Sequence, residues 1–244
     1  MTADKRKRLQ GAGMLFTFPP MDGPTLQDLL GEALPDAQDA EVQRVNKGLQ
    51  PLVMETWSLE GICETPNVQQ NHLAQLCRLV EGESWICQPL NGQGAATMAS
   101  LGCAHGVVSA DSRPDGYIFR RVAGGATAPV VGGVLECKGT VAATIDALRQ
   151  AFAEATNVAL AHRRSGVACK DVRVPVWSTT GLQAQFGVVR MLKPALPYLT
   201  VACRPLCLND DRDLLLTARL LVATRVCAPN LSSSFQRSAS LAIN

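Results

Sequence analysis

The order of the apolar segments after residue 66 is the sequence feature that most constrains the fold. Residues 67–80 and, over a longer stretch, residues 140–164 carry apolar side chains at the spacing of an amphipathic helix. Asn209 and Asp210 are expected to cap a last helix. Short apolar runs between turn-forming residues predict strands at residues 84–89, 116–119, 130–135, 172–177, 182–192 and 198–208. This order predicts an α/β (α+β) domain built around one mixed central sheet, with helices flanking it.

The chain as a whole is predicted to contain four regions. Residues 1–20 form a basic flexible tail, and residues 21–60 form an acidic annex with two helices. Residues 61–228 hold the mixed-sheet domain, and residues 229–244 form a Ser-rich mobile tail. Because the annex has no residue pattern typical of chemistry, we expect it to support the domain.

The composition excludes several classes of protein. Apolar residues make up 47% of the chain and charged residues 18%, which suits a buried core and does not suit a disordered chain. No apolar run reaches the length of a membrane-spanning helix, and the polar, basic start lacks the apolar centre of a secretory signal. The nine cysteines are odd in number and unevenly spaced, which favours reduced thiols in an intracellular protein.

The charges are distributed unevenly along the chain. The net charge is +2, but residues 9–110 hold 3 Lys and Arg against 11 Asp and Glu, whereas residues 111–193 hold 11 against 6. A basic segment attracts polyanions, nucleic acid above all. An ordinary solvated surface has the same composition, so the charge alone leaves both interpretations open.

A basic run stands near the start of the chain and consists of Lys5, Arg6, Lys7 and Arg8. Such runs serve as nuclear-import signals or bind nucleic acid, and they also occur as solubilising tails. The run therefore indicates the nucleus as one destination of the protein.

Three charged side chains in the basic segment stand where predicted strands meet polar residues. Asp115 directly precedes the strand at 116–119, and Glu136 and Lys138 follow the one at 130–135. Because alternate residues of a strand share a face, Glu136 and Lys138 point the same way, and Asp115 joins them if the two strands pair. Two close carboxylates favour a cation between them, and oxygen ligands of this kind suit Mg²⁺.

The same residues resemble the signature of the PD-(D/E)XK nucleases, the restriction-endonuclease-like superfamily. Pro114-Asp115, a spacer and Glu136-Cys137-Lys138 match that signature, and the predicted order of helix, three strands, helix and strand resembles the core of that fold. Residues 174–177, Thr180-Gly181 and Phe186 resemble the strand and turn after the core helix in divergent eukaryotic members, such as Crinkler-type effectors and mobile-element-linked nuclease domains. The resemblance covers residues 64–227, so it implies a nuclease-like domain over residues 61–228.

The resemblance also implies a function and further site residues. It implies hydrolysis of phosphodiester bonds in nucleic acid, with DNA favoured. Asp115 and Glu136 would hold Mg²⁺ or Mn²⁺, and Lys138 would assist the attacking water. It adds Glu64 as a helical metal ligand and Gln150 as a polar helix residue near the site. The candidates for phosphate contacts are arginines of the basic segment: Arg113, Arg120, Arg121, Arg163 and Arg164.

Two other functions are left open by the sequence. A catalytically silent relative would keep the nuclease fold and act as a nucleic-acid- or protein-binding module. An unrelated α+β interaction domain would hold Asp115 and Glu136 far apart. In that case Asp115 would lie in a turn, and Glu136 and Lys138 would lie on a solvated strand face.

Overall fold

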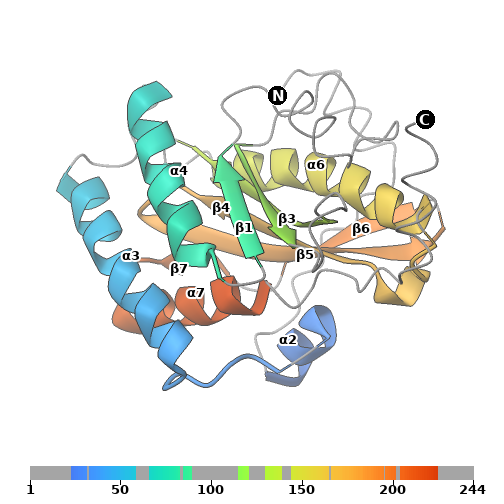
Figure 1. The fold of residues 1–244 in the computed structure, drawn as a ribbon, viewed down its shortest axis with the longest axis horizontal. Helices are drawn as coiled ribbons and strands as arrows, with labels where there is room; N and C mark the ends of the chain where they lie inside the picture. Colours follow the sequence, from blue (N-terminus) through green and yellow to red (C-terminus); the bar gives the residue numbers. More distant parts are fainter. Residues whose placement is uncertain are drawn as a thin grey trace.

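A computed structural model of the chain describes residues 23–31, 33–58, 66–82, 85–89, 115–120, 130–138, 144–164, 166–194, 196–201 and 204–224. Its helices are α2 (Gly23–Leu30), α3 (Ala40–Ser58), α4 (Pro66–Val80), α6 (Thr144–Arg164) and α7 (Asp211–Ala223), with a short 3-10 helix at Cys169–Asp171. Its strands are β1 (Trp85–Pro89), β2 (Gly116–Arg120), β3 (Val130–Cys137), β4 (Arg173–Thr179), β5 (Gln183–Lys193), β6 (Leu196–Val201) and β7 (Leu206–Cys207) (Figure 1). Within these ranges, no helix is both long enough and apolar enough to cross a membrane.

The described strands form one mixed sheet. Their order is β1-β2-β3-β4-β5-β6, and β7 pairs with the start of β5. β3 and β4 run parallel, and the other neighbouring pairs run antiparallel. A parallel pair needs a long crossover, and α6 provides it between β3 and β4. The predicted α+β class with a mixed central sheet is therefore confirmed.

Helices cover both faces of this sheet (Figure 1). α6 packs on β3, β4 and β5, and its Phe152 lies in one buried apolar cluster with Val134 and Val176. A second cluster, on the opposite face, joins residues of α3, α4 and α7 to the sheet and includes Leu221 and Trp177. The alternation of side chains along each strand supplies both clusters, because successive residues point to opposite faces.

Helix α3, which the sequence places in an acidic annex, packs into the core of the sheet domain. Val42, Val45 and Leu49 are buried in the same cluster as Trp177 of β4. Arg44 also donates a hydrogen bond of 2.7 Å to the carbonyl oxygen of Leu79 in α4. The helix thus contacts the sheet directly and shares its buried core.

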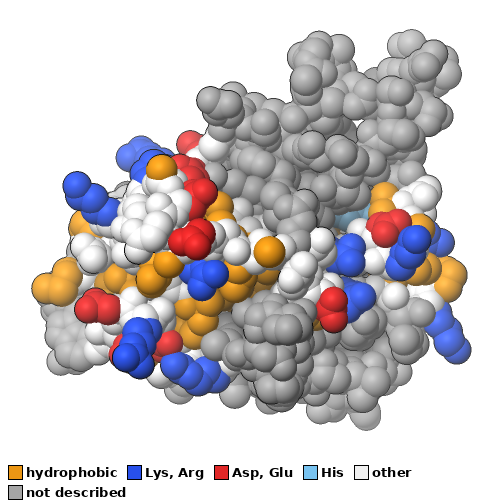
Figure 2. Space-filling view, turned by 90° about the horizontal axis from the view of Figure 1, so that it is seen from below, with side chains coloured by type: hydrophobic (Ala, Val, Ile, Leu, Met, Phe, Trp, Pro, Cys, Tyr) orange, Lys and Arg blue, Asp and Glu red, His pale blue; other side chains and the backbone are white. Residues whose placement is uncertain are grey.

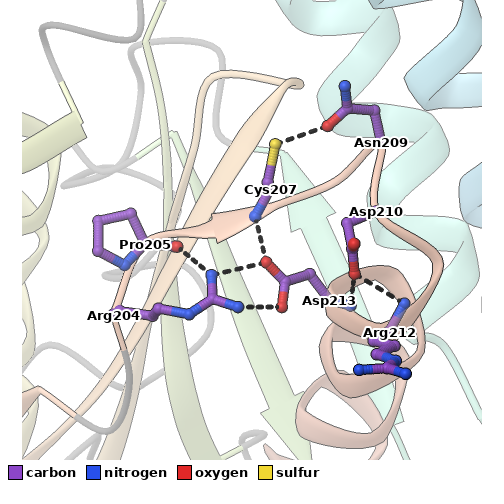
Figure 3. A network of polar contacts seen from close by, with 7 residues as sticks. All are labelled: Arg204, Pro205, Cys207, Asn209, Asp210, Arg212 and Asp213. Atoms are coloured by element: carbon purple, nitrogen blue, oxygen red, sulfur yellow. Dashed lines mark hydrogen bonds and ion pairs between the residues drawn. The ribbon is translucent and has the colours of Figure 1, made fainter.

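The start of α7 is tied to β7 by a group of polar contacts (Figure 3). Asp210 caps the helix as predicted, because its Oδ1 accepts hydrogen bonds from the backbone N–H groups of Arg212 and Asp213, at 3.0 and 3.1 Å. The Asp213 carboxylate accepts two hydrogen bonds of 2.7 Å from Arg204 and one of 2.8 Å from the backbone N–H of Cys207. These contacts, which we call the α7 clasp, hold β7 against the helix.

The strand predicted at residues 198–208 is divided into two. β6 pairs with the later part of β5, and β7 pairs with Gln183 and Ala184 at its start. Pro205 stands directly before β7, and proline has no N–H group to donate to a ladder. A continuous strand is therefore not formed, and both pieces line the same edge of β5.

Candidate active site

The pairing of β2 with β3 brings three of the predicted site residues together. Gly116 lies opposite Leu135, so Asp115, one residue earlier, stands beside Glu136. The backbone N–H of Asp115 donates to Oε2 of Glu136 at 3.4 Å, and Oδ2 of Asp115 accepts from the backbone N–H of Cys137 at 2.7 Å. Lys138 donates from Nζ to Oε1 of Glu136 at 2.7 Å. Asp115, Glu136 and Lys138, the acidic pair and its lysine, therefore form one cluster.

The cluster is graded from buried to exposed. The Glu136 side chain has no exposed surface, whereas 27% of the Lys138 side chain is exposed. Asp115 is half-buried. The backbone N–H of Lys138 continues the parallel ladder by donating to the carbonyl oxygen of Thr179, at 3.0 Å. A ligand from solvent would therefore reach Glu136 past Asp115 and Lys138.

Burial and charge together give Glu136 an unusual proton affinity. Burial, and after it the charge of Asp115, raise the pKa of the Glu136 carboxyl to about 8, although the Lys138 ammonium opposes the rise. Burial lowers the pKa of Lys138, but the charge of Glu136 and the hydrogen bond to it outweigh this, so the pKa is raised overall. Lys138 thus stays cationic, yet it does not fully compensate the two carboxylates.

This arrangement suits the binding of a hard cation. Two carboxylates that repel each other in a desolvated position gain most from a divalent ion placed between them. Mg²⁺ is commonly bound by one or two carboxylates, with water and substrate phosphate as its remaining ligands. In the part of the chain that the structure describes, no group of three or more His, Cys, Asp or Glu side chains could hold a metal ion. The acidic pair would therefore depend on water, on the substrate or on Glu64, which lies outside the described residues.

Of the other predicted site residues, Gln150 and Arg163 have described side chains, and no hydrogen bond joins either of them to the three cluster residues. Gln150 lies in the first half of α6 and is half-buried, with no hydrogen bond to the three cluster residues in the described structure. Arg163 donates to the carbonyl oxygen of Val167, just beyond the end of α6. Because α6 leads from the end of β3 back to the start of β4, Arg163 lies at the opposite end of the sheet from Glu136.

The side chains of the other four predicted phosphate-contact arginines lie outside the described structure. Arg164 ends α6 and Arg120 ends β2, and their side chains lie outside the described part of the structure. Arg113 and Arg121 lie outside the described residues altogether. The predicted phosphate contacts of these four residues stay predictions.

Two residues next to the cluster were not singled out by the sequence analysis. Ser178 of β4 lies opposite Glu136, and Gln185 of β5 lies opposite Ser178. Both are buried, with exposed fractions of 0% and 2%. The sequence contains a signal for them, because each is a polar residue at an inward-facing position of an otherwise apolar strand. The residue that lies opposite each of them on the neighbouring strand depends on the strand register, which cannot be read from the sequence.

The comparisons with known proteins add no relative. Neither a scan against protein-family models nor searches of curated proteins and of solved structures find a match to this chain. The interpretation of the site therefore depends on its own geometry.

Proposed function

We propose that this protein is a metal-dependent nuclease of the PD-(D/E)XK type that hydrolyses phosphodiester bonds in nucleic acid, with DNA as the favoured substrate. The observation that carries the proposal is the meeting of Asp115, Glu136 and Lys138 at the ends of two paired strands. The order of α4, β1, β2, β3, α6 and β4, with β3 and β4 parallel and β1, β2 and β3 antiparallel to their neighbours in that order, supports a restriction-endonuclease-like core.

Each residue has a separate role in the proposed reaction. Asp115 and Glu136 hold Mg²⁺ or Mn²⁺, which, when bound, acidifies a water and neutralises charge on the scissile phosphate. Lys138 is the partly exposed cation of the cluster, so its ammonium can donate a hydrogen bond to the attacking water or to a phosphate oxygen. The backbone N–H of Cys137 fixes the Asp115 carboxylate, so that its orientation is set before the ion arrives.

The substrate would have to approach from the side on which Lys138 and Asp115 are exposed. Figure 2 shows one face of the molecule, on which the Lys and Arg side chains of the described residues are mixed with Asp and Glu. The described basic side chains on that face do not form a continuous area. Phosphate contacts are better sought around the cluster itself, because Arg113 precedes Asp115 by two residues in the sequence.

Cleavage by paired variants tests the proposal. We expect Glu136→Gln and Lys138→Met to lower the rate of Mg²⁺-dependent cleavage of a plasmid by about a hundredfold or more, since metal assistance contributes several kcal/mol. Glu136→Gln should also abolish Mg²⁺ binding, whereas Lys138→Met should leave it in place, because lysine is not a ligand. Asp171→Asn and Lys170→Met are matched controls, because both residues are exposed at the other end of β4.

The silent-relative alternative makes a different prediction for the same preparations. Wild-type protein that melts cooperatively but cuts neither DNA nor RNA with Mg²⁺ or Mn²⁺ would contradict nuclease activity. A metal that binds the folded protein raises its melting temperature. An absent Mg²⁺-dependent shift in the wild type would therefore favour a binding module without a metal site.

A further inference from the structure

Four polar side chains form a row across the sheet at the level of the acidic pair. Asp115 stands beside Glu136, Glu136 lies opposite Ser178, and Ser178 lies opposite Gln185. The row therefore runs from the residue directly before β2 across β3, β4 and β5. We call these four residues the polar row.

The polar row faces α6. Val134, Val176 and Val189 belong to the apolar cluster that packs against α6. Glu136, Ser178 and Gln185 stand two or four residues away from them on the same strands and so share their face. The neighbouring positions on the same sheet face are apolar, so the polar side chains are not part of a generally polar surface.

Two members of the row lack a partner for a buried polar atom. Oγ of Ser178 and Oε1 of Gln185 have no hydrogen-bond partner among the residues that the structure describes. A buried hydroxyl or amide oxygen is normally hydrogen-bonded, and each exception calls for an explanation. Directly opposed residues on one sheet face have Cβ atoms close enough for their side chains to interact. The strand register therefore makes Ser178 a neighbour of Glu136, although no hydrogen bond joins their side chains.

We propose that Ser178 and Gln185 are positioning residues for the metal site, an inference that rests on the proposed function. Both oxygens of Glu136 are now engaged, Oε1 by Lys138 and Oε2 by the backbone of Asp115. When Lys138 turns to the attacking water, Glu136 loses its closest donor. The Ser178 hydroxyl then donates to the Glu136 carboxylate, and the side-chain N–H of Gln185 donates to the Ser178 oxygen and holds that hydroxyl in place.

Outer groups of this kind orient the ligands of a metal, and removing one costs about ten- to a hundredfold in metal affinity or activity. We therefore expect Ser178→Ala to weaken Mn²⁺ binding, measured by calorimetry and by the electron paramagnetic resonance of free Mn²⁺, by about tenfold or more. Gln185→Leu should weaken it less, because Gln185 acts through Ser178. Ser178→Thr keeps the hydroxyl and should restore binding close to that of the native protein.

Thr217→Val is the matched control. Thr217 of α7 is equally buried, and its Oγ1 also lacks a partner in the described residues, but it lines a small cavity beside Trp177 on the opposite face of the sheet. It should leave Mn²⁺ affinity unchanged. For the Ser178→Ala variant, kcat for DNA cleavage should fall while KM for DNA stays the same, since the hydroxyl acts on Glu136 and not on the substrate.

The outcomes separate this inference from the proposed function. If native protein binds Mn²⁺ and cleaves DNA while Ser178→Ala does both equally well, the positioning role is wrong and the nuclease proposal stands. Equal losses in Ser178→Ala and Thr217→Val, with matching losses of thermal stability, would show a purely structural effect and also overturn the role. If the native protein neither binds Mn²⁺ nor cleaves nucleic acid, both proposals are wrong.

Discussion

Two ion pairs of this protein have the same closest distance, but the pKa values of their carboxyl groups are shifted in opposite directions. Lys138 and Glu136 approach to 2.7 Å, as do Arg204 and Asp213 of the α7 clasp. In both pairs the carboxylate is almost completely buried, with 0% and 7% of the side chain exposed, and the basic partner is more exposed. Yet the pKa of Glu136 is raised and that of Asp213 is lowered.

The difference lies in what surrounds each carboxylate. Burial raises the pKa of Asp213 too, but the hydrogen bonds from Arg204 and from the backbone N–H of Cys207, together with the charge of Arg204, outweigh it. Glu136 lies deeper and next to a second carboxylate, Asp115, and Lys138 cannot compensate both effects. A satisfied carboxylate is typical of a structural contact, whereas strongly perturbed carboxyl groups cluster at functional sites, which agrees with the site that we propose.

The largest expected effect is on the pH dependence of stability without metal. The folded-state pKa of Glu136, about 8, lies above its ordinary value of 4.5, so the folded state binds more protons between these limits. The stabilisation is complete below pH 4.5 and is lost as the pH rises through 8. We expect the free energy of unfolding to fall by a few kcal/mol over this range, and Glu136→Gln to remove most of that fall. Chemical denaturation of both proteins at several pH values measures it.

A second group titrates in part of the same range and must be separated. Burial lowers the pKa of His72 from 6.5 to about 4, so its contribution is present above pH 6.5 and is lost as the pH falls through 4. This trend opposes that of Glu136 below pH 6.5. The comparison of native protein with Glu136→Gln is therefore sharpest between pH 6.5 and 8.5. Parallel curves there would contradict the raised pKa of Glu136.

Replacing the buried anion of the α7 clasp should have a smaller effect. Asp213→Asn removes the charge that accepts both hydrogen bonds of Arg204 and the N–H of Cys207, so we expect a loss of about 2 kcal/mol at pH 7. Since the pKa of Asp213 is lowered from 3.8, its stabilisation is present above that value and is lost at more acidic pH. Urea denaturation at pH 7 measures the loss. Cleavage activity per folded molecule should stay unchanged, and a variant that is stable but inactive would break the comparison.

The elements of the fold were largely predictable because their signals are local. The Asp210 cap, the helix now seen at Thr144–Arg164 and the strand at Val130–Cys137 each follow from residues that are neighbours in sequence. The division of the strand at 198–208 was not predicted, because it depends on how β5 shares its length between two partners. The finer nuclease-like topology stays a prediction.

The sequence predicts the three charged residues of the candidate site but not the two polar residues beside them. Asp115, Glu136 and Lys138 stand at strand ends, where a polar residue after an apolar run is visible in the sequence. Ser178 and Gln185 become neighbours of Glu136 only through the register of three strands, and register is a property of the folded sheet. The basic segment predicts Arg163 as a phosphate contact, but its position at the opposite end of the sheet from Glu136 follows from the direction of the crossover helix.

The smallest expected effect on stability comes from a substitution that keeps the charge of the basic residue in an ion pair but changes its hydrogen-bond geometry. Arg204→Lys keeps the charge of the α7 clasp but loses the two parallel hydrogen bonds to Asp213. Because 62% of the Arg204 side chain is exposed, solvent screens its charge, and we expect a loss of stability of about 1 kcal/mol or less, measured by urea denaturation.

Lys138→Arg is the corresponding exchange at the candidate site. It also keeps the charge, but a guanidinium cannot take the place of a compact ammonium beside a water nucleophile, so cleavage should fall sharply while stability changes little. Exchanging the basic residue of a structural ion pair should leave the cleavage rate unchanged, whereas the same exchange in a catalytic pair should lower it. Equal activity of Lys138→Arg and the native protein would place Lys138 with the structural contacts.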